Sequence, residues 1–214
     1  MRKARLVVAV FVGALACSAF ASTSALAATP GWMVNGTNLA TTAALATTAA
    51  VDQKGVLKAA GVTVTCEGTS LNGVEPKLEA SGMASVKSLE FTGCKASSPC
   101  VLEGEKVKTE EILVEATLEG TLAVVATFKP KTGTLFTKLT FTEEAGKECA
   151  LAGNQPVTGK VKVLAPTGQD ERILQLISSI TTAASKELLV GSGEASLEGS
   201  ILIKLASGLP WSLL

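Results

Sequence analysis

The sequence predicts an all-β protein, an antiparallel β-sandwich or barrel-like domain of roughly ten strands. Two observations support this prediction. Apolar and polar residues alternate with a period of two over most of the chain after Val62, which is typical of strands with one face in a core. Glycine, proline and asparagine interrupt the alternation at short intervals, which is typical of turns between short strands.

The alternation defines the individual strands. Its clearest case is residues 157–163, where valine and glycine alternate with threonine and lysine. Residues 114–124 and 195–205 repeat the scheme with alanine, leucine and glycine inward. Further strands are expected at residues 62–66, 86–92, 106–109 and 135–143. Two short strands are expected within residues 32–48 and 51–58, with a hairpin turn at Asp52-Gln53-Lys54-Gly55, although the alanines there also suit a helix.

Residues 171–184 fit the pattern least well. Asp170 and Glu171 precede an apolar run, as at the start of a helix, but the run also suits a strand. By a small margin the acidic start favours one short helix.

A short internal sequence similarity relates residues 114–122 to residues 193–201, with Gly120 matching Gly199. One interpretation is two related β halves, at about 28–128 and 129–214. The other is that two strands solve the same packing problem, each glycine allowing a bend or bulge. The second is favoured because the match is short and solenoid arrays need several repeats.

The first residues predict a signal peptide at residues 1–27. Arg2, Lys3 and Arg5 precede an apolar run that ends in the small-residue sequence Ala25-Leu26-Ala27. The run is too short to span a bilayer, and no later stretch is apolar for long enough. We therefore expect a β-rich mature domain at 28–214, with no membrane span, that is secreted or extracellular.

A second cleavage site is also compatible with this leader. Ala14-Leu15-Ala16-Cys17 resembles the processing site of bacterial lipoproteins, but it has Ala14 where that pattern usually has leucine. Cleavage there would put a lipid anchor on Cys17 and make the protein a membrane-anchored lipoprotein. Cleavage after Ala27 is the preferred interpretation.

Removal of the leader leaves four cysteines, Cys66, Cys94, Cys100 and Cys149. An even number in an exported chain predicts two disulfides, and three connectivities are possible. The favoured pairing joins Cys94 to Cys100 across a short loop and Cys66 to Cys149 across a long one. No zinc site is expected, because the chain has no histidine and no Cys-x-x-Cys pair.

Composition limits the chemistry that the chain can perform. It has neither histidine nor tyrosine, so histidine-based triads and a tyrosine acid are excluded. No phosphate-binding glycine loop or calcium-type loop occurs, and no cofactor is expected. Removal of the leader takes away three of the 19 basic residues, so the mature chain has 16 basic and 19 acidic residues. This small excess of negative charge does not suit a nucleic-acid partner.

The remaining candidates for catalysis are carboxylates and serines. The pairs Glu110-Glu111 and Glu143-Glu144 suggest an alternative, a glutamate-dependent hydrolase acting on envelope polysaccharide. Adjacent glutamates on a strand point to opposite faces, however, and few aromatic residues are present to stack on a sugar. Ser178, Ser179 and Ser185 near Lys186 are more typical of surface positions than of a nucleophile.

Several short motifs together resemble an uncharacterised group of exported actinobacterial proteins. They are Trp32-Met33-Val34-Asn35-Gly36-Thr37, Phe91-Thr92-Gly93-Cys94 with Pro99-Cys100, Leu118-Glu119-Gly120-Thr121-Leu122, and Leu205-Ala206-Ser207-Gly208 with Trp211. The resemblance implies export, β structure and paired cysteines, and it implies no catalytic residue. We therefore expect a noncatalytic β domain with a structural or binding role at the cell envelope or outside the cell, its partner unknown.

Overall fold

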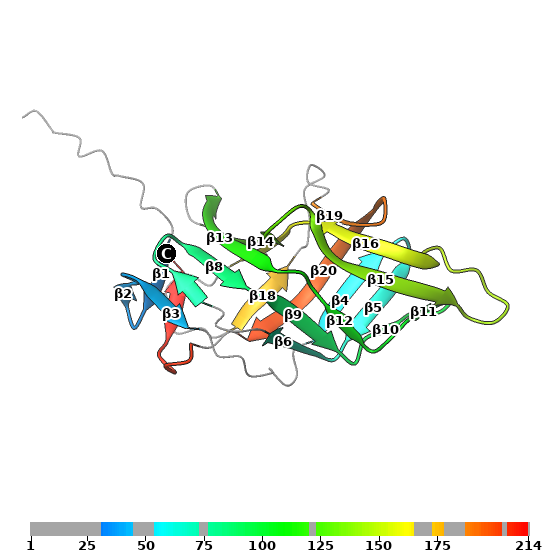
Figure 1. Cartoon of the computed structure of the whole chain (residues 1–214), viewed down its shortest axis with the longest axis horizontal. Coiled ribbons are helices and arrows are strands. Elements are labelled where there is room, and N and C mark those ends of the chain that lie inside the picture. The colour runs from blue at the N-terminus through cyan, green and yellow to red at the C-terminus, as the bar shows by residue number, and fades with distance from the viewer. Residues whose placement is uncertain are drawn as a thin grey trace, which may run out of the picture.

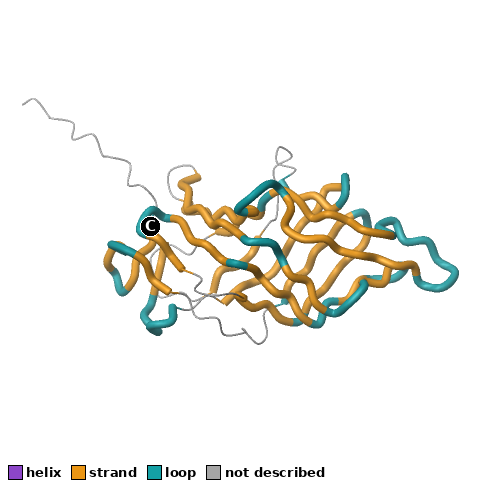
Figure 2. The backbone as a smooth tube through the Cα atoms, in the orientation of Figure 1, coloured by secondary structure: helices purple, strands orange, loops and turns teal. Residues whose placement is uncertain are grey.

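The computed structural model describes residues 31–44, 54–72, 77–119, 123–164, 173–177, 187–202 and 205–213. Within these ranges every regular element is a strand (Figure 2), which confirms the all-β prediction. No helix in this part of the chain is long and apolar enough to cross a membrane.

The strands are short, and most are joined by tight turns. In chain order they are β1 Trp32–Val34, β2 Thr37–Asn38, β3 Thr42–Ala44, β4 Gly55–Ala59, β5 Val62–Cys66, β6 Gly68–Asn72, β7 Lys77–Glu79, β8 Met83–Val86, β9 Ser88–Thr92, β10 Lys95–Ala96, β11 Cys100–Leu102, β12 Lys106–Lys108, β13 Ile112–Glu119, β14 Ala123–Pro130, β15 Leu135–Glu143, β16 Gly153–Gly159, β17 Val161–Leu164, β18 Ile173–Ile177, β19 Leu188–Val190, β20 Gly193–Leu202 and β21 Trp211–Leu213.

These strands form three sheets in which all pairs are antiparallel. The largest sheet has the order β11-β15-β16-β19-β20-β18-β17-β14-β13-β8-β7-β3, with β4, β5 and β10 attached to β20. The other two have the orders β2-β1-β21 and β12-β9-β6. β4 and β20 come from opposite ends of the chain, yet they pair directly, from Ala59 opposite Ala195 to Gly55 opposite Gly199.

Half of the molecule closes into a barrel (Figures 1 and 2). Going round it, β20 pairs with β4, β4 with β5, and β5 with β10. β5 and β6 are separated by one residue, and β9 and β10 by two residues, and β6 pairs with β9 beyond these breaks. β9 pairs with β12, and on the other side β20 pairs with β19, β19 with β16, and β16 with β15. β12 and β15 then meet and close the ring.

Two expected strands, 86–92 and 157–163, are split in two where the chain bends. The run 157–163 becomes β16 and β17, which lie in different parts of the large sheet. Gly159 makes the bend with φ of +110°, and a Cβ at this position would overlap the carbonyl oxygen of Glu187. That oxygen accepts a hydrogen bond of 2.7 Å from the backbone N–H of Lys160. Similar single-residue breaks at Glu67 and Lys87 separate β5 from β6 and β8 from β9.

The structure corrects the preference for a helix at residues 171–184. Ile173–Ile177 is strand β18, which pairs with β20 from Ile173 opposite Leu202 to Ile177 opposite Glu198. Pairing inside a large sheet outweighs the weak helical signal of two acidic residues, because tertiary contacts override local propensity. The rest of the predicted helix lies outside the described residues.

Two hairpin turns have the same backbone shape. Asn35 and Gly36 join β1 to β2 with φ values of 51° and 75°, and Ala60 and Gly61 join β4 to β5 with 47° and 77°. Positive φ at both central residues suits the twist of paired strands, and asparagine and glycine tolerate it best. The hairpin turn expected at 52–55 lies in part outside the described residues; of its four residues, Gly55 opens β4.

The internal sequence similarity has a local packing explanation in its second segment, residues 193–201. Gly199 has φ of +152°, and a Cβ there would lie 2.5 Å from the backbone oxygen of Lys54. Glycine is therefore required by the close approach of β4, in line with the packing interpretation. Gly120 lies outside the described residues, and the division into related halves stays a prediction.

The two ends of the described chain meet at the end of the molecule opposite the β15–β16 loop (Figure 1). β1 pairs with β21, which places the rings of Trp32 and Trp211 edge to face with centroids 5.7 Å apart. The indole N–H of Trp32 donates to the backbone oxygen of Met83 at 2.8 Å. Both rings are buried, so two of the few aromatic residues serve to close this end of the core.

Candidate functional site

The barrel encloses an apolar cavity of about 80 Å³. Its wall draws on strands from all around the ring and on β13, β14 and β17 beside it. The lining residues are Gly55, Leu57, Val64, Cys66, Leu89, Phe91, Val107, Thr109, Ile112, Phe128, Phe136, Thr137, Leu139, Val157, Val161, Leu188 and Leu197. The period-two alternation of the sequence therefore places the apolar face of each strand towards one shared interior.

The two hydroxyls in the wall are engaged by the backbone. Thr109 Oγ1 accepts a hydrogen bond of 2.8 Å from the N–H of Leu89, and Thr137 Oγ1 donates one of 2.7 Å to the backbone oxygen of Lys108. With both groups satisfied, the cavity offers a guest dispersion contacts and little hydrogen bonding. Such a space favours hydrocarbon over water.

The cavity follows from the residue types that the chain uses. A small barrel has an interior that side chains either fill or leave open for one small ligand. Valine and leucine dominate this wall, and only three phenylalanines contribute to it, because the chain has few aromatic residues. Gly55 adds no volume, and a Cβ there would lie 3.3 Å from the ring of Phe91. Small side chains thus leave the centre of the ring unfilled.

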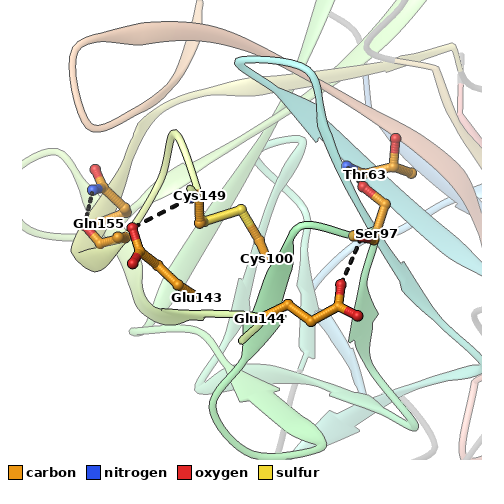
Figure 3. The surroundings of a disulfide bond; sticks show 9 residues. Thr63, Ser97, Cys100, Glu143, Glu144, Cys149 and Gln155 are labelled. Atoms are coloured by element: carbon orange, nitrogen blue, oxygen red, sulfur yellow. Dashed lines mark hydrogen bonds between the residues drawn. A yellow bond between two sulfur atoms is a disulfide. The ribbon is translucent and has the colours of Figure 1, made fainter. Parts of the chain in front are cut away.

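The four cysteines form two disulfides, as predicted, but the favoured pairing is wrong. Cys66 bonds Cys94, and Cys100 bonds Cys149 (Figure 3). The cause is the register between β5–β6 and β9–β10, which places Lys95 opposite Thr65 and Thr92 opposite Gly68. Cys66 and Cys94 are then directly across from each other, with Cα atoms 3.9 Å apart.

The same register explains why Cys94 and Cys100 do not pair. Between them, Lys95 and Ala96 are held in strand β10 against β5, so the chain cannot fold back on itself there. Cys100 instead begins β11 opposite Glu143, and the loop after β15 returns Cys149 to it, with Cα atoms 4.9 Å apart. Sequence spacing contains no information about this register.

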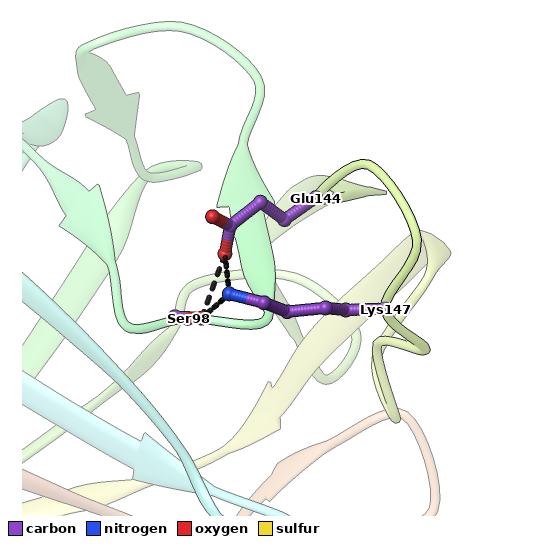
Figure 4. A network of polar contacts seen from close by, with 3 residues as sticks. All are labelled: Ser98, Glu144 and Lys147. Carbon is purple, nitrogen blue, oxygen red and sulfur yellow. Dashed lines mark hydrogen bonds and ion pairs between the residues drawn. The ribbon is translucent and has the colours of Figure 1, made fainter.

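A polar cluster of exposed side chains lies close to the second disulfide (Figure 3) and is formed by Ser98, Glu144 and Lys147 (Figure 4). Ser98 Oγ donates to Glu144 Oε2 at 2.7 Å, and Lys147 Nζ lies 2.9 Å from the same oxygen and 3.1 Å from Ser98 Oγ. The hydrogen bond from Ser98 and then the ammonium of Lys147 hold the pKa of Glu144 below its ordinary value of 4.5. The N–H of Glu144 also donates to the backbone oxygen of Pro99 at 2.9 Å.

This geometry suits loop attachment better than activation of Ser98. A nucleophilic serine needs a base that can accept its proton. Here the ammonium of Lys147 is a donor to both oxygens, and a carboxylate with a lowered pKa is a weaker base. The side chains of Glu144 and Lys147 are 45% and 51% exposed, so water also competes for these groups. The cluster ties the 97–100 loop to the loop after β15.

The glutamate pairs predicted as an alternative site lie on the outer surface. Glu110 and Glu111 are exposed, and Glu111 forms an ion pair of 2.7 Å with Lys131. Glu143 Oε1 accepts a bond of 3.4 Å from the N–H of Cys149 (Figure 3), and Glu144 belongs to the cluster with Ser98. None of these four side chains lines the cavity.

Other predicted positions are outside the described ranges. They are Cys17 with the whole leader, and the serines near Lys186. Among the residues that the structure describes, no group of three or more cysteine, aspartate or glutamate side chains is arranged to hold a metal ion.

Sequence reasoning missed the cavity and the role of Ser98. The alternation predicted which residues point inward, but an unfilled volume depends on how wide the ring is, and that depends on strand pairing between distant segments. Ser98 has no motif, since its partners Glu144 and Lys147 are 46 and 49 residues away. Comparison with protein-family models, curated proteins and solved structures finds no match.

Proposed function

We propose that this chain is an exported, noncatalytic β domain that acts by binding, and that its binding element is the apolar cavity of the barrel. The observation that carries the proposal is a space of about 80 Å³ whose wall is apolar and whose two hydroxyls are already bonded. A guest that occupies this space regains dispersion contacts that the empty wall lacks.

The cysteines and the leader support a location outside the cytoplasm. Disulfides persist in oxidising compartments, and the two bonds here close the barrel wall and an adjacent loop. Secretion is the preferred location, with release after Ala27; attachment to a membrane through lipid on Cys17 is the alternative. Either route puts the barrel at the cell envelope or beyond it.

The hydrolase alternative has less support. A glycosidase needs two carboxyl groups that face each other across a sugar, whereas Glu110, Glu111, Glu143 and Glu144 are exposed. At least two of them, Glu111 and Glu144, are engaged by lysines. The binding role therefore remains the better proposal.

Xenon is a suitable first probe because it is small, apolar and without hydrogen-bonding groups. We expect the purified mature protein to bind xenon, seen as saturable shifts of the methyl resonances of wall residues such as Val64 and Val157. The double variant Val64→Ile with Val157→Ile fills most of the cavity and should remove the shifts. Val101→Ile adds the same methyl group at a position 47% exposed on β11 and should leave them unchanged. Equal shifts in all three proteins, or none in the wild type, would contradict the proposal.

A further inference from the structure

The barrel has a seam where its ring closes. Every other neighbouring pair in the ring is joined by a ladder, but β12 and β15 share no register among the residues that the structure describes. β12 is held on its far side by β9, from Lys106 opposite Thr92 to Lys108 opposite Glu90. β15 is held on its far side by β16.

Three hydrogen bonds cross this seam and its approaches. The N–H of Glu103 donates to the oxygen of Thr140 at 2.8 Å, Thr137 Oγ1 donates to the oxygen of Lys108 at 2.7 Å, and the N–H of Glu110 donates to the oxygen of Phe136 at 2.6 Å. Between the first two bonds, the chain that leads into β12 covers five residues, from 103 to 108, whereas β15 covers only three, from 140 to 137. The two edges are therefore out of step, and a side-chain hydroxyl replaces a ladder bond in the middle.

The cavity lies directly behind the seam. Val107 and Thr109 line it from the β12 edge, and Phe136, Thr137 and Leu139 line it from the β15 edge. Thr137 thus has two roles, since it is part of the cavity wall and also supplies the central bond of the seam. Separation of the two edges would open the wall at this place and leave the other ladders of the ring intact.

The volume limits what can enter. A cavity of about 150 Å³ binds benzene with its six carbon atoms, so a space of about 80 Å³ accepts about three carbon atoms. The two hydroxyls of the wall already bond the backbone and the rest of the wall is apolar, so the cavity favours hydrocarbon over a polar guest. A molecule larger than these few atoms can insert only one end, and the rest must remain outside the ring.

From these observations we infer that the cavity binds the terminal carbons of an unbranched aliphatic chain, which enters between β12 and β15. This inference rests on the proposed binding function and adds the ligand class and the route. The rest of the chain and its head group lie on the outer surface of the seam. The exposed residues of the β12 and β15 edges carry both signs of charge, with Lys106, Lys108 and Lys138 and also Glu105 and Glu110, so the surface does not select one sign of charge.

The ligand class is tested with n-octanoate and n-octanol, which share a chain end and differ in head group. We expect both to bind and to displace xenon, while an octanoate that ends in a tert-butyl group binds at least tenfold more weakly because its end is too wide. Preference for one head group would show which kind of amphiphile is favoured and would keep the shared chain-end inference. Equal binding of the tert-butyl analogue, or xenon binding without chain binding, would overturn the inference and leave the proposed function standing. Absence of xenon binding would remove both.

The route is tested with matched threonine variants on β15. Thr137→Val removes the central bond of the seam and keeps the shape of the wall, and Thr137→Ser keeps the hydroxyl. Thr140→Val is the control, because Thr140 Oγ1 donates to Asn154 Oδ1 of β16 at 2.8 Å, and the substitution leaves the backbone oxygen that accepts the seam bond from Glu103 in place. Exchange of octanoate with a ¹³C-labelled methyl end, followed by NMR, should be about fivefold faster in Thr137→Val, as expected for the loss of one hydrogen bond. The exchange rate should be unchanged in Thr137→Ser and Thr140→Val. Equal exchange rates in Thr137→Val and Thr140→Val would rule out this route.

Discussion

Adding methyl groups to the barrel wall should stabilise the protein, against the usual effect of enlarging core side chains. Inserting methylenes into a filled core costs about 1–3 kcal/mol. A cavity of about 80 Å³ reverses this effect, so that an added methyl group stabilises the protein. Residual cavities cost about 24 cal/mol per Å³, or about 2 kcal/mol for this one. One methyl fills about a third of the space. Val64→Ile and Val157→Ile should therefore each raise the free energy of unfolding by about 0.7 kcal/mol, and together by about 1.4 kcal/mol.

Urea unfolding without reductant measures this change from the transition midpoint and its slope. In a thermal scan the double variant should melt about 3–6 °C higher. Val101→Ile, on the exposed face of β11, should stay within about 0.5 kcal/mol of the wild type. A loss of more than about 1 kcal/mol in the double variant would contradict this expectation, since it would mean that side chains already fill the ring.

Three further outcomes follow from the geometry. Gly159→Ala should lower the free energy of unfolding by more than about 2 kcal/mol in the same urea assay, because its Cβ would overlap the oxygen of Glu187 at a positive φ. Paired replacement of Cys66 and Cys94 by serine should cost about 3–4 kcal/mol, as expected for a closed loop of 28 residues, and disulfide mapping of the wild type should recover only the two pairs of the structure. The cluster around Glu144 should be complete above pH 4.5 and weaken as the pH falls through its lowered pKa, since protonation removes the negative charge that Ser98 and Lys147 stabilise; amide shifts of the loop after β15 should follow that titration, and Glu144→Gln should abolish it.

Local pattern was sufficient to predict strands that are flanked by turns on both sides. The expected strands at 62–66 and 135–143 coincide with β5 and β15, because each alternates cleanly and ends at a turn or a break. The turn at Asn35-Gly36 is likewise explained by its own two residues, since asparagine and glycine both tolerate positive φ. These features depend on neighbouring residues only.

Features that depend on distant strands could not be predicted in this way. The split of 157–163 at Gly159 is caused by Glu187, and the partner of Cys66 is chosen by the register of β9 and β10. Ile173–Ile177 becomes a strand because β20 lies beside it. The cavity is harder still to predict, because it depends both on the interior volume of the closed ring and on the volume of the side chains inside it.

The most direct test of a binding role for the barrel is a crystal structure of the mature protein under xenon pressure. We expect xenon density inside the ring, in contact with Val64, Val157 and Phe136, and none at this place in the double variant Val64→Ile with Val157→Ile. Side chains that meet across the centre of the ring and leave no xenon density there would contradict it.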